Sequence, residues 1–134
     1  MKKILITITI LLIVVFCVIA TNKKSEYIKE DTLMYKSITM EEAKEIFKEK
    51  GNYIIVDVRR PDEYNEGHIP NAINIVNETI DKEPKELKDK GQSIYVYCRT
   101  GRRSKEASEK LVNLGYANVI EIGGIVDWNG DIEK

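Results

Sequence analysis

The stretch that decides the fold is SIYVYCRTGRRS, residues 93–104. It opens with an apolar run, residues 93–97, of the kind that forms a strand buried on both faces of a parallel sheet. Cys98 closes this run. A helix is expected over residues 102–114, because apolar side chains then recur at helical spacing until Gly115. The stretch therefore predicts a strand, a tight loop and a helix in direct succession.

Helices and strands alternate along the rest of the chain. Thr39 and Glu42 fit a capping box, in which each side chain satisfies a free backbone donor, and this predicts a helix that ends by Gly51. Further elements are expected as strands at 53–56, 72–75 and 118–122, a short helix at 62–65 and a weak helix at 83–90. This alternation predicts an α/β fold with a central, mainly parallel sheet flanked by helices on both sides.

Two polar residues mark the expected ligand-binding edge of this sheet. In parallel α/β sheets, ligands bind outside the carboxyl ends of the strands. Asp57 and Cys98 each follow a predicted strand directly. The topology therefore predicts a site at this edge of the sheet.

The loop after Cys98 gathers positive charge around a single thiol. Gly101 gives the backbone the freedom to curl around the sulfur, so that the amides of residues 99–104 point inward. Such amides at a helix start form an anion-binding nest, and they favour thiolate over thiol. Three arginines add to this charge: Arg99, Arg102 and Arg103. The loop thus predicts a nucleophilic cysteine and an anionic substrate.

The same residues have a simpler interpretation. A cysteine after an apolar run is often just a small buried hydrophobic residue, and arginines at a helix start are often solvated. Positive charge in the first helical turn is unfavourable with the helix dipole, however. Arg102 and Arg103 therefore favour the presence of an anion, and with it the functional interpretation.

The N-terminus predicts export. Residues 4–20 carry no charge and follow Lys2 and Lys3, which is the layout of a signal peptide or a signal anchor over residues 1–21. A polar linker is expected over 22–37 and a single domain over 38–132. The domain would be anchored in the cell membrane and face outward, or be secreted or periplasmic after cleavage. A lipoprotein box at Cys17 is matched only loosely, because the bulky Phe16 stands before it.

Composition and cysteine count argue against nucleic-acid binding, an internal disulfide and a metal site. The 134 residues have a formal net charge of −1, and basic residues do not mass on one segment outside 98–104, so nucleic-acid binding is not indicated. Cys17 lies in the targeting segment, which leaves Cys98 as the one thiol of the predicted domain and excludes an internal disulfide. The chain has one histidine, His68, and no Cys-x-x-Cys motif, so no metal site is expected.

Several motifs together resemble the single-domain rhodaneses, which are sulfurtransferases. The resemblance covers about residues 37–130 in the family's order. Asn71 departs from it, because the family usually has glycine there. The matching motifs are Asp57-Val58-Arg59, Glu63-Tyr64, Gly67-His68-Ile69-Pro70, Ala72-Ile73-Asn74-Ile75, the active-site loop 97–104, Leu114-Gly115-Tyr116 and Gly123-Gly124-Ile125 with Trp128.

The resemblance implies a rhodanese-like domain in which Cys98 is the nucleophile. Its thiolate would take the outer sulfur of a small anionic donor such as thiosulfate, form a persulfide, and pass the sulfur to cyanide or to a thiol such as that of a thioredoxin-like protein. No cofactor is implied. The expected substrate-binding residues are Arg99, Thr100, Gly101, Arg102, Arg103 and Ser104, with Arg103 preferred for the charged end of the donor. The expected structural supports are Asp57, Arg59, Glu63 and His68.

Two other functions stay open. A cysteine phosphatase or arsenate reductase also holds a cysteine in an oxyanion cradle, but the tyrosine phosphatase motif is Cys-x5-Arg, whereas Arg103 makes the present loop Cys-x4-Arg. A shorter loop suits one sulfur atom better than a tetrahedral phosphate. The second alternative is a rhodanese-fold module that binds a partner without catalysis, or that acts as a redox relay.

Overall fold

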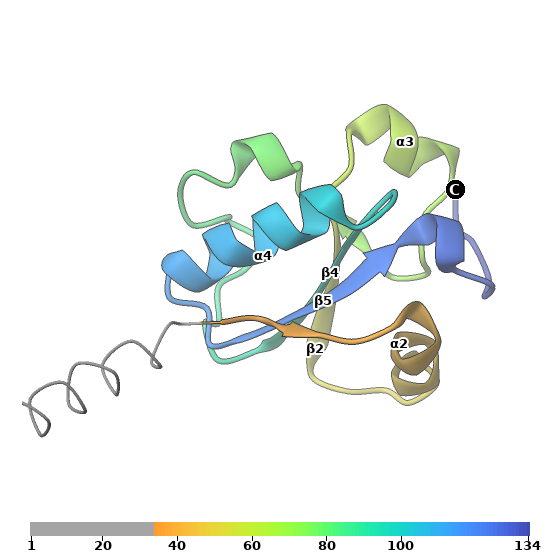
Figure 1. Ribbon diagram of the computed structural model, residues 1–134, viewed down its shortest axis with the longest axis horizontal. Helices are drawn as coiled ribbons and strands as arrows, with labels where there is room; N and C mark the ends of the chain where they lie inside the picture. Colours follow the sequence, from red (N-terminus) through yellow and green to blue (C-terminus); the bar gives the residue numbers. More distant parts are fainter. Residues whose placement is uncertain (1–33) are drawn as a thin grey trace, which may run out of the picture. The chain divides into compact units, whose positions relative to one another are not determined.

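An all-parallel sheet of five strands forms the centre of the computed structural model, which describes residues 34–134 (Figure 1). The strand order is β1-β5-β4-β2-β3, and every neighbouring pair is parallel. The strands are β1 (Lys36–Ser37), β2 (Tyr53–Asp57), β3 (Ile73–Asn74), β4 (Ser93–Cys98) and β5 (Asn118–Gly124). The predicted fold class is confirmed.

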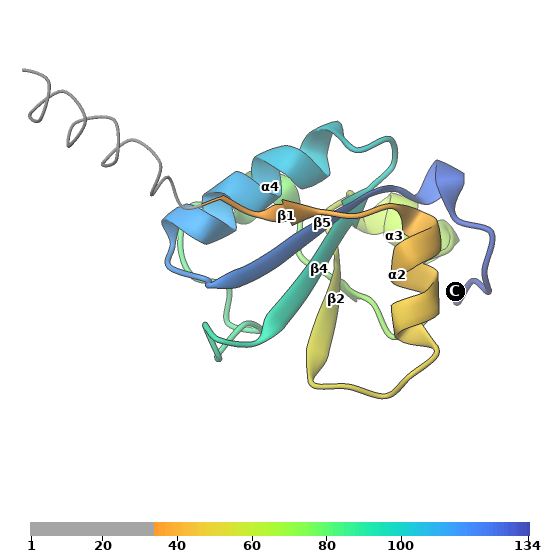
Figure 2. The ribbon, with the colours of Figure 1, turned by 60° about the horizontal axis from the view of Figure 1, so that its bottom comes forward.

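Three helices and one short 3-10 turn connect these strands, and a second 3-10 turn follows β5 (Figure 2). They are α2 (Met40–Phe47), α3 (Pro61–Glu66), α4 (Arg102–Asn113), η1 (Asn77–Thr79) and η2 (Ile125–Asp127). The predicted capping box begins α2: the Glu42 amide donates to Thr39 Oγ1 at 3.1 Å, and the Thr39 amide donates to Glu42 Oε2 at 2.8 Å. No helix among residues 34–134 has the length and apolarity needed to cross a membrane.

Two hydrophobic clusters lie on opposite faces of the sheet. Consecutive strand residues point to opposite faces, and in β2 and β4 they divide accordingly between the clusters. The cluster beneath α4 contains Val56, Val58, Ile75, Ile80, Leu87, Ile94, Val96, Cys98, Ala107, Leu111, Val112, Tyr116 and Val119. The cluster beneath α2 contains Met40, Ala43, Ile55, Ile69, Ala72, Tyr97 and Ile122. Helices therefore cover both faces, as predicted.

The helix predicted at residues 83–90 is wrong, because this segment forms turns. Leu87 is its one buried apolar residue, which does not make a helical face. Long-range contacts hold the segment instead. The Tyr116 hydroxyl donates to the Leu87 carbonyl at 2.8 Å, and the Lys90 ammonium reaches the Leu114 carbonyl at 2.7 Å.

The predicted linker extends too far. Lys36 and Ser37 form β1 and pair with Ile120 and Glu121 of β5, so they belong to the sheet. The predicted targeting segment 1–21, and the linker as far as residue 33, lie outside the described residues.

The pairing of β4 with β5 is irregular close to the predicted site. Val96 pairs with Glu121 and Cys98 pairs with Gly124, so β5 has one residue more than β4 between these two pairs. Such a bulge bends a strand and redirects its side chains. It sets the end of β5 beside the loop that leaves β4.

The capping box allows a direct test of helix α2. We expect Thr39→Ala to lower the free energy of unfolding by about 1 kcal/mol, because a free backbone donor of the first turn loses its acceptor. Thr39→Ser keeps the hydroxyl and is the matched control, with a change of a few tenths of a kcal/mol. Urea unfolding measures both, and equal stability of the two variants would show that the box contributes nothing.

Candidate active site

The loop between β4 and α4 folds around the Cys98 sulfur. Gly101 has a φ of 105°, in the left-handed region that glycine adopts without strain, and it lies immediately before the first residue of α4. Its amide donates to Cys98 Sγ at 3.0 Å. Among the described amides of residues 99–104, this is the one within hydrogen-bonding distance of the sulfur. Of the inward-pointing amides predicted for this loop, the Gly101 amide is therefore the one that contacts the sulfur.

Cys98 lies beneath the loop. The residue is 1% exposed, and its thiol donates to Ser104 Oγ over 3.6 Å. Ser104 lies on the inward face of the first turn of α4 and is fully buried. The sulfur is therefore closed to solvent in this structure.

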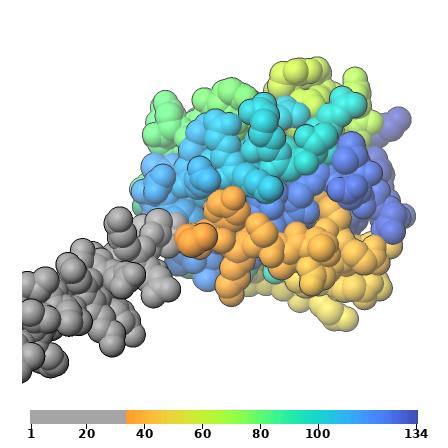
Figure 3. Space-filling model, in the orientation of Figure 1, coloured from red at the N-terminus to blue at the C-terminus, as the bar shows by residue number. Residues whose placement is uncertain are grey.

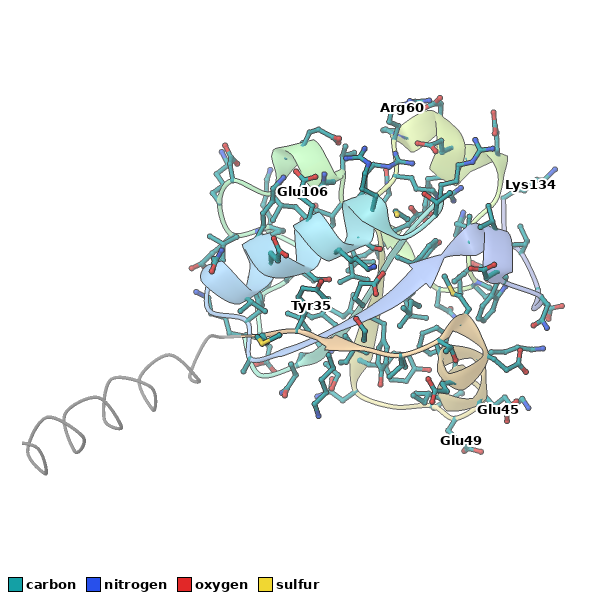
Figure 4. All side chains as sticks on the ribbon, in the orientation of Figure 1. Tyr35, Glu45, Glu49, Arg60, Glu106 and Lys134 are labelled. Carbon is teal, nitrogen blue, oxygen red and sulfur yellow. The ribbon has the colours of Figure 1, made fainter. Side chains whose placement is uncertain are left out.

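A positively charged cleft of about 640 Å³ lies at the outer side of this loop. Four arginines and one glutamate line it, so its field attracts anions. The lining residues are Arg60, Pro61, Val76, Glu78, Arg99, Thr100, Arg102 and Arg103. Figure 4 shows Arg60 beside α3. This arginine was missed in the sequence, as were Val76 and Glu78 at η1, because these residues lie in connecting segments other than the cysteine loop.

Arg103 is held by Glu63 of α3. Two guanidinium nitrogens donate to the two carboxylate oxygens, at 2.8 and 3.0 Å. This hydrogen bonding lowers the pKa of Glu63 to about 2, against the opposing effect of burial, and it raises the pKa of Arg103. The pair joins the start of α4 to α3. Atoms of these two segments lie side by side on the face shown in Figure 3. Glu63 thus holds the first turn of α4, and Arg103 is anchored at the cleft.

The other loop cations extend toward solvent. Arg99 and Thr100 are exposed, and the Arg102 side chain is 79% exposed, with only a 3.8 Å contact to Glu106. Figure 4 labels Glu106 one turn along α4. Arg99 and Arg102 are therefore placed to meet an incoming anion, whereas Arg103 is already occupied.

Asp57 and Arg59 form a buried brace at the end of β2. Arg59 Nη2 donates to Asp57 Oδ2 at 2.6 Å, Arg59 Nε donates to Oδ1 at 3.0 Å, and Nη2 also reaches the Gly67 carbonyl at 2.7 Å. Burial by itself lowers the pKa of Arg59, but the hydrogen bond and charge of Asp57 raise it overall. The brace links β2 to the end of α3.

His68 belongs to the same support and not to the cysteine loop. Its ring stacks on Tyr64 with centroids 3.8 Å apart, and Nδ1 lies 3.0 Å from the Tyr64 carbonyl oxygen. Its backbone pairs with Glu133 near the C-terminus. The structure describes no contact between His68 and residues 98–104.

Gly124 makes room for the loop. A Cβ at this position would lie 2.5 Å from Thr100 Cα and closer still to the Arg99 carbonyl oxygen. Sequence reasoning noted the glycine pair 123–124 as a motif but did not find this role. The close approach depends on the β5 bulge, which has no local sequence pattern.

Glu121 is a second residue that the sequence did not reveal as part of the site. It is 3% exposed, and its Oε1 accepts hydrogen bonds from Ser104 Oγ at 2.6 Å and from the Gly123 amide at 2.8 Å. In the sequence it is one polar residue inside an apolar strand. Only the packing of β5 against α4 brings its carboxylate next to the cysteine loop.

Comparison with known proteins identifies relatives over most of this region. The family model for the rhodanese-like domain matches residues 39–131. The thiosulfate sulfurtransferase GlpE of Coxiella burnetii is 38% identical over 97 residues, which are 72% of this chain and 89% of that protein. The chain spans 22% of the adenylyltransferase and sulfurtransferase UBA4 of Candida albicans and 60% of the putative sulfur carrier protein YrkF of Bacillus subtilis, at 33% and 31% identity.

Solved structures of rhodanese-like proteins have the same fold as this chain. A rhodanese-like domain protein from Staphylococcus aureus is 35% identical with a TM-score of 0.63, and the match covers 73% of this chain and 96% of that one. A rhodanese from E. coli, solved with anions, is 34% identical with a TM-score of 0.57, and the match covers 61% and 98% of the two chains. The resemblance found in the sequence is confirmed.

The contact at Gly124 predicts a large effect of one methyl group. We expect Gly124→Ala to lower the free energy of unfolding by at least about 2 kcal/mol, because backbone atoms of the loop cannot move aside without distorting the turn. Gly91→Ala is the matched control, since a Cβ there meets only the flexible Asp89 side chain, at 3.3 Å. Urea unfolding compares them, and a Gly124→Ala protein as stable as the control would contradict the close packing.

The Glu63–Arg103 pair predicts a dependence of stability on pH. Because folding lowers the pKa of Glu63 from 4.5 to about 2, its stabilising contribution is present above pH 4.5 and is lost as the pH falls toward 2. We therefore expect the stability of the wild type to fall more steeply between pH 5 and pH 2 than that of Glu63→Gln. Glu66→Gln removes the same charge from an exposed position of α3 and should keep the wild-type slope. Urea unfolding at several pH values measures this, and parallel curves for wild type and Glu63→Gln would refute it.

Proposed function

The chain belongs to the rhodanese-like domain family, and from that membership we propose that it transfers a sulfane sulfur through a persulfide on Cys98. The donor is thiosulfate or a similar small anion, and the acceptor is cyanide or a thiol. The observation that carries the proposal is the Cys98 sulfur, which accepts the Gly101 amide at 3.0 Å beneath an arginine-lined cleft. Relatives named thiosulfate sulfurtransferase support the same reaction class.

The first half-reaction loads the cysteine. The Cys98 thiolate attacks the outer sulfur of thiosulfate, a new S–S bond forms, and the S–S bond of the donor breaks with its electron pair leaving on sulfite. The product is a Cys98 persulfide with one negative charge. The Gly101 amide, already directed at Cys98 Sγ, stabilises the attacking thiolate, and later the thiolate that is restored, without having to reorganise.

The second half-reaction returns the cysteine to its starting form. The carbon of cyanide, or the sulfur of an acceptor thiolate, attacks the outer sulfur of the persulfide. The S–S bond breaks, and its electron pair restores the Cys98 thiolate. No oxidant, reductant or metal enters this sequence, because each step exchanges one nucleophile for another at sulfur.

The arginines have different roles in binding the donor. Arg99 and Arg102 are exposed at the cleft and can follow an anion as it enters. Arg60 lines the other wall, where its guanidinium donates to both carboxylate oxygens of Asp62 at 3.1 Å. Arg103 keeps its position through Glu63, so it contributes a fixed field near the sulfur and not a mobile clamp.

One observation favours a second function. Cys98 is 1% exposed, which suits a rhodanese-fold module that binds a partner, or relays a redox signal, without taking up a donor. Phosphatase or arsenate reductase activity has less support, because the arginine of the Cys-x4-Arg sequence is already bound to a carboxylate.

We propose further that the domain acts outside the cytoplasm, on an acceptor thiol such as that of a thioredoxin-like protein. The uncharged segment 4–20 behind Lys2 and Lys3 supports export. Outside the cytoplasm, small sulfur compounds diffuse away from the cell. A persulfide that is bound to the protein keeps the sulfur in place until an acceptor thiol takes it.

Mass spectrometry of the full-length chain tests the proposed reaction. After incubation with thiosulfate, we expect one added sulfur atom on the peptide that contains Cys98, and thiocyanate after cyanide is added. Cys98→Ser should reduce thiocyanate formation to background, because a hydroxyl does not replace the thiolate. Cys17→Ser is the matched control and should keep full activity.

Two results would reject this function. One is release of phosphate from p-nitrophenyl phosphate without thiocyanate formation from thiosulfate and cyanide. The other is a Cys98→Ser protein that forms thiocyanate as fast as the Cys17→Ser control.

A further inference from the structure

Ser104 lies between the thiol of Cys98 and a buried carboxylate. Its Oγ is 3.6 Å from Cys98 Sγ and 2.6 Å from Glu121 Oε1. The shorter distance is typical of a hydroxyl that donates to an ionised carboxylate. Ser104 Oγ also lies 2.9 Å from the Gly101 carbonyl oxygen and 3.4 Å from that of Gly123. A hydroxyl has one hydrogen to donate and two lone pairs, so we assign the hydrogen to the shortest contact, Glu121, and a lone pair to the Cys98 thiol. The three side chains form one continuous hydrogen-bonded line.

The fold places Glu121 in this line from a distant part of the chain. Val119 of β5 belongs to the cluster beneath α4, and Glu121, two residues further on, faces the same side. It pairs with Ser37 of β1 and Val96 of β4, so neighbouring strands hold its backbone on both sides. The carboxylate is therefore fixed beneath the start of α4.

The hydrogen-bond partners of Glu121 are all neutral. Besides Ser104, they are the Gly123 amide, which donates to Oε1 at 2.8 Å, and the Ser37 hydroxyl, which donates to Oε2 at 3.3 Å. No salt bridge reaches Glu121 within residues 34–134. Taking up a proton therefore breaks no ion pair, in contrast to Glu63, whose protonation would release Arg103. A buried carboxylate without a cation suits a proton acceptor better than a structural brace.

We propose that Glu121 accepts the proton of Cys98 through Ser104 and so generates the nucleophilic thiolate. The thiol proton moves to Ser104 Oγ while the hydroxyl proton of Ser104 moves to Glu121 Oε1. The products are a thiolate, an intact serine hydroxyl that now donates to the sulfur, and a protonated carboxyl group. The number of protons in the line does not change, and none has to cross the loop to solvent.

This inference deepens the proposed function, on which its role in turnover rests. The Cys98 side chain is shielded by residues 99–101, so bulk water is a poor base for it. An internal acceptor solves that difficulty. Glu121 does not touch the transferred sulfur itself, and its influence runs through Ser104.

Other charged and titratable groups also face this line. The hydrogen bond to Glu63 raises the pKa of Arg103 first, and the charge of Cys98 raises it further. Tyr35 lies on the other side of Glu121: burial raises its pKa first, and the charges of Glu109 and Glu121 raise it further. Neither group lies between the sulfur and the carboxylate, so neither replaces the relay.

Alkylation of Cys98 at different pH values tests the relay independently of sulfur transfer. The full-length chain is treated with iodoacetamide, and the peptide that contains Cys98 is quantified separately from that of Cys17. In the wild type the thiolate population follows an internal equilibrium, so the rate should change only a few-fold per pH unit between pH 6 and pH 8. In Glu121→Gln the proton must leave to solvent, and the rate should change about tenfold per pH unit. At pH 6 we expect Glu121→Gln to be on the order of 10²-fold slower.

Two further variants separate a relay from a structural role. Glu109→Gln removes an equal charge from the exposed side of α4 and should keep the shallow wild-type profile. Ser104→Ala should show the same steep profile as Glu121→Gln, and the double variant should be no worse than either single one, because both changes cut the same line. Thermal unfolding confirms that each variant is folded, and Ser104→Ala carries the test if Glu121→Gln is not.

The outcomes distinguish the relay from the proposed function. Steep profiles in both relay variants support the relay, even if the wild type forms no thiocyanate from thiosulfate and cyanide, in which case only the sulfur-transfer proposal fails. Profiles parallel to the wild type overturn the relay, whether or not thiocyanate is formed. Faster alkylation of Glu121→Gln at pH 6 also overturns it, because Glu121 would then merely repel the thiolate.

Discussion

The chain turns from β4 into α4 within three residues, and this turn requires two positions without side chains. Gly101 adopts a left-handed conformation that directs its amide at the Cys98 sulfur, and Gly124 lets the backbone of Arg99 and Thr100 lie directly against β5. A side chain at either glycine would move the sulfur away from its donor or lift the loop off the sheet. The reactive position of the cysteine is thus a consequence of backbone packing, and the surrounding charges act on a geometry that is already set.

The charges around the loop serve different purposes according to their burial. Asp57 and Arg59 neutralise each other in the interior and brace the end of β2, while Glu63 fixes Arg103 at the cleft wall. Arg99 and Arg102 stay exposed and give the entrance its positive field. Glu121 differs from all of these, because it is buried among neutral donors. The site therefore combines rigid pairs that maintain shape with less constrained groups that can exchange an anion or a proton.

The parts of this structure that were predictable from the sequence are those encoded by neighbouring residues. Apolar runs gave the three long strands, Thr39 and Glu42 marked the start of α2, and Cys98 with Gly101 located the site. The helix predicted at 83–90 is wrong, because a single buried leucine cannot anchor a helix and the segment is held by the Leu114 carbonyl and the Tyr116 hydroxyl from other parts of the fold. Glu121, Gly124 and Arg60 escaped detection for the same reason. Their roles arise from contacts between β5, α4 and the β2–α3 connection. No local sequence pattern indicates which distant segments will be in contact.

The two outer strands of the sheet are short, and this affects how the domain behaves at high concentration. β1 and β3 each contain only two residues, so each sheet edge offers very few unpaired backbone groups to a second molecule. An intruding strand would find too short a template to extend the sheet between molecules. The buried strand β4 is not at an edge, because β2 and β5 pair with it along its length. The domain can therefore keep a strongly hydrophobic parallel sheet and still resist strand-mediated aggregation.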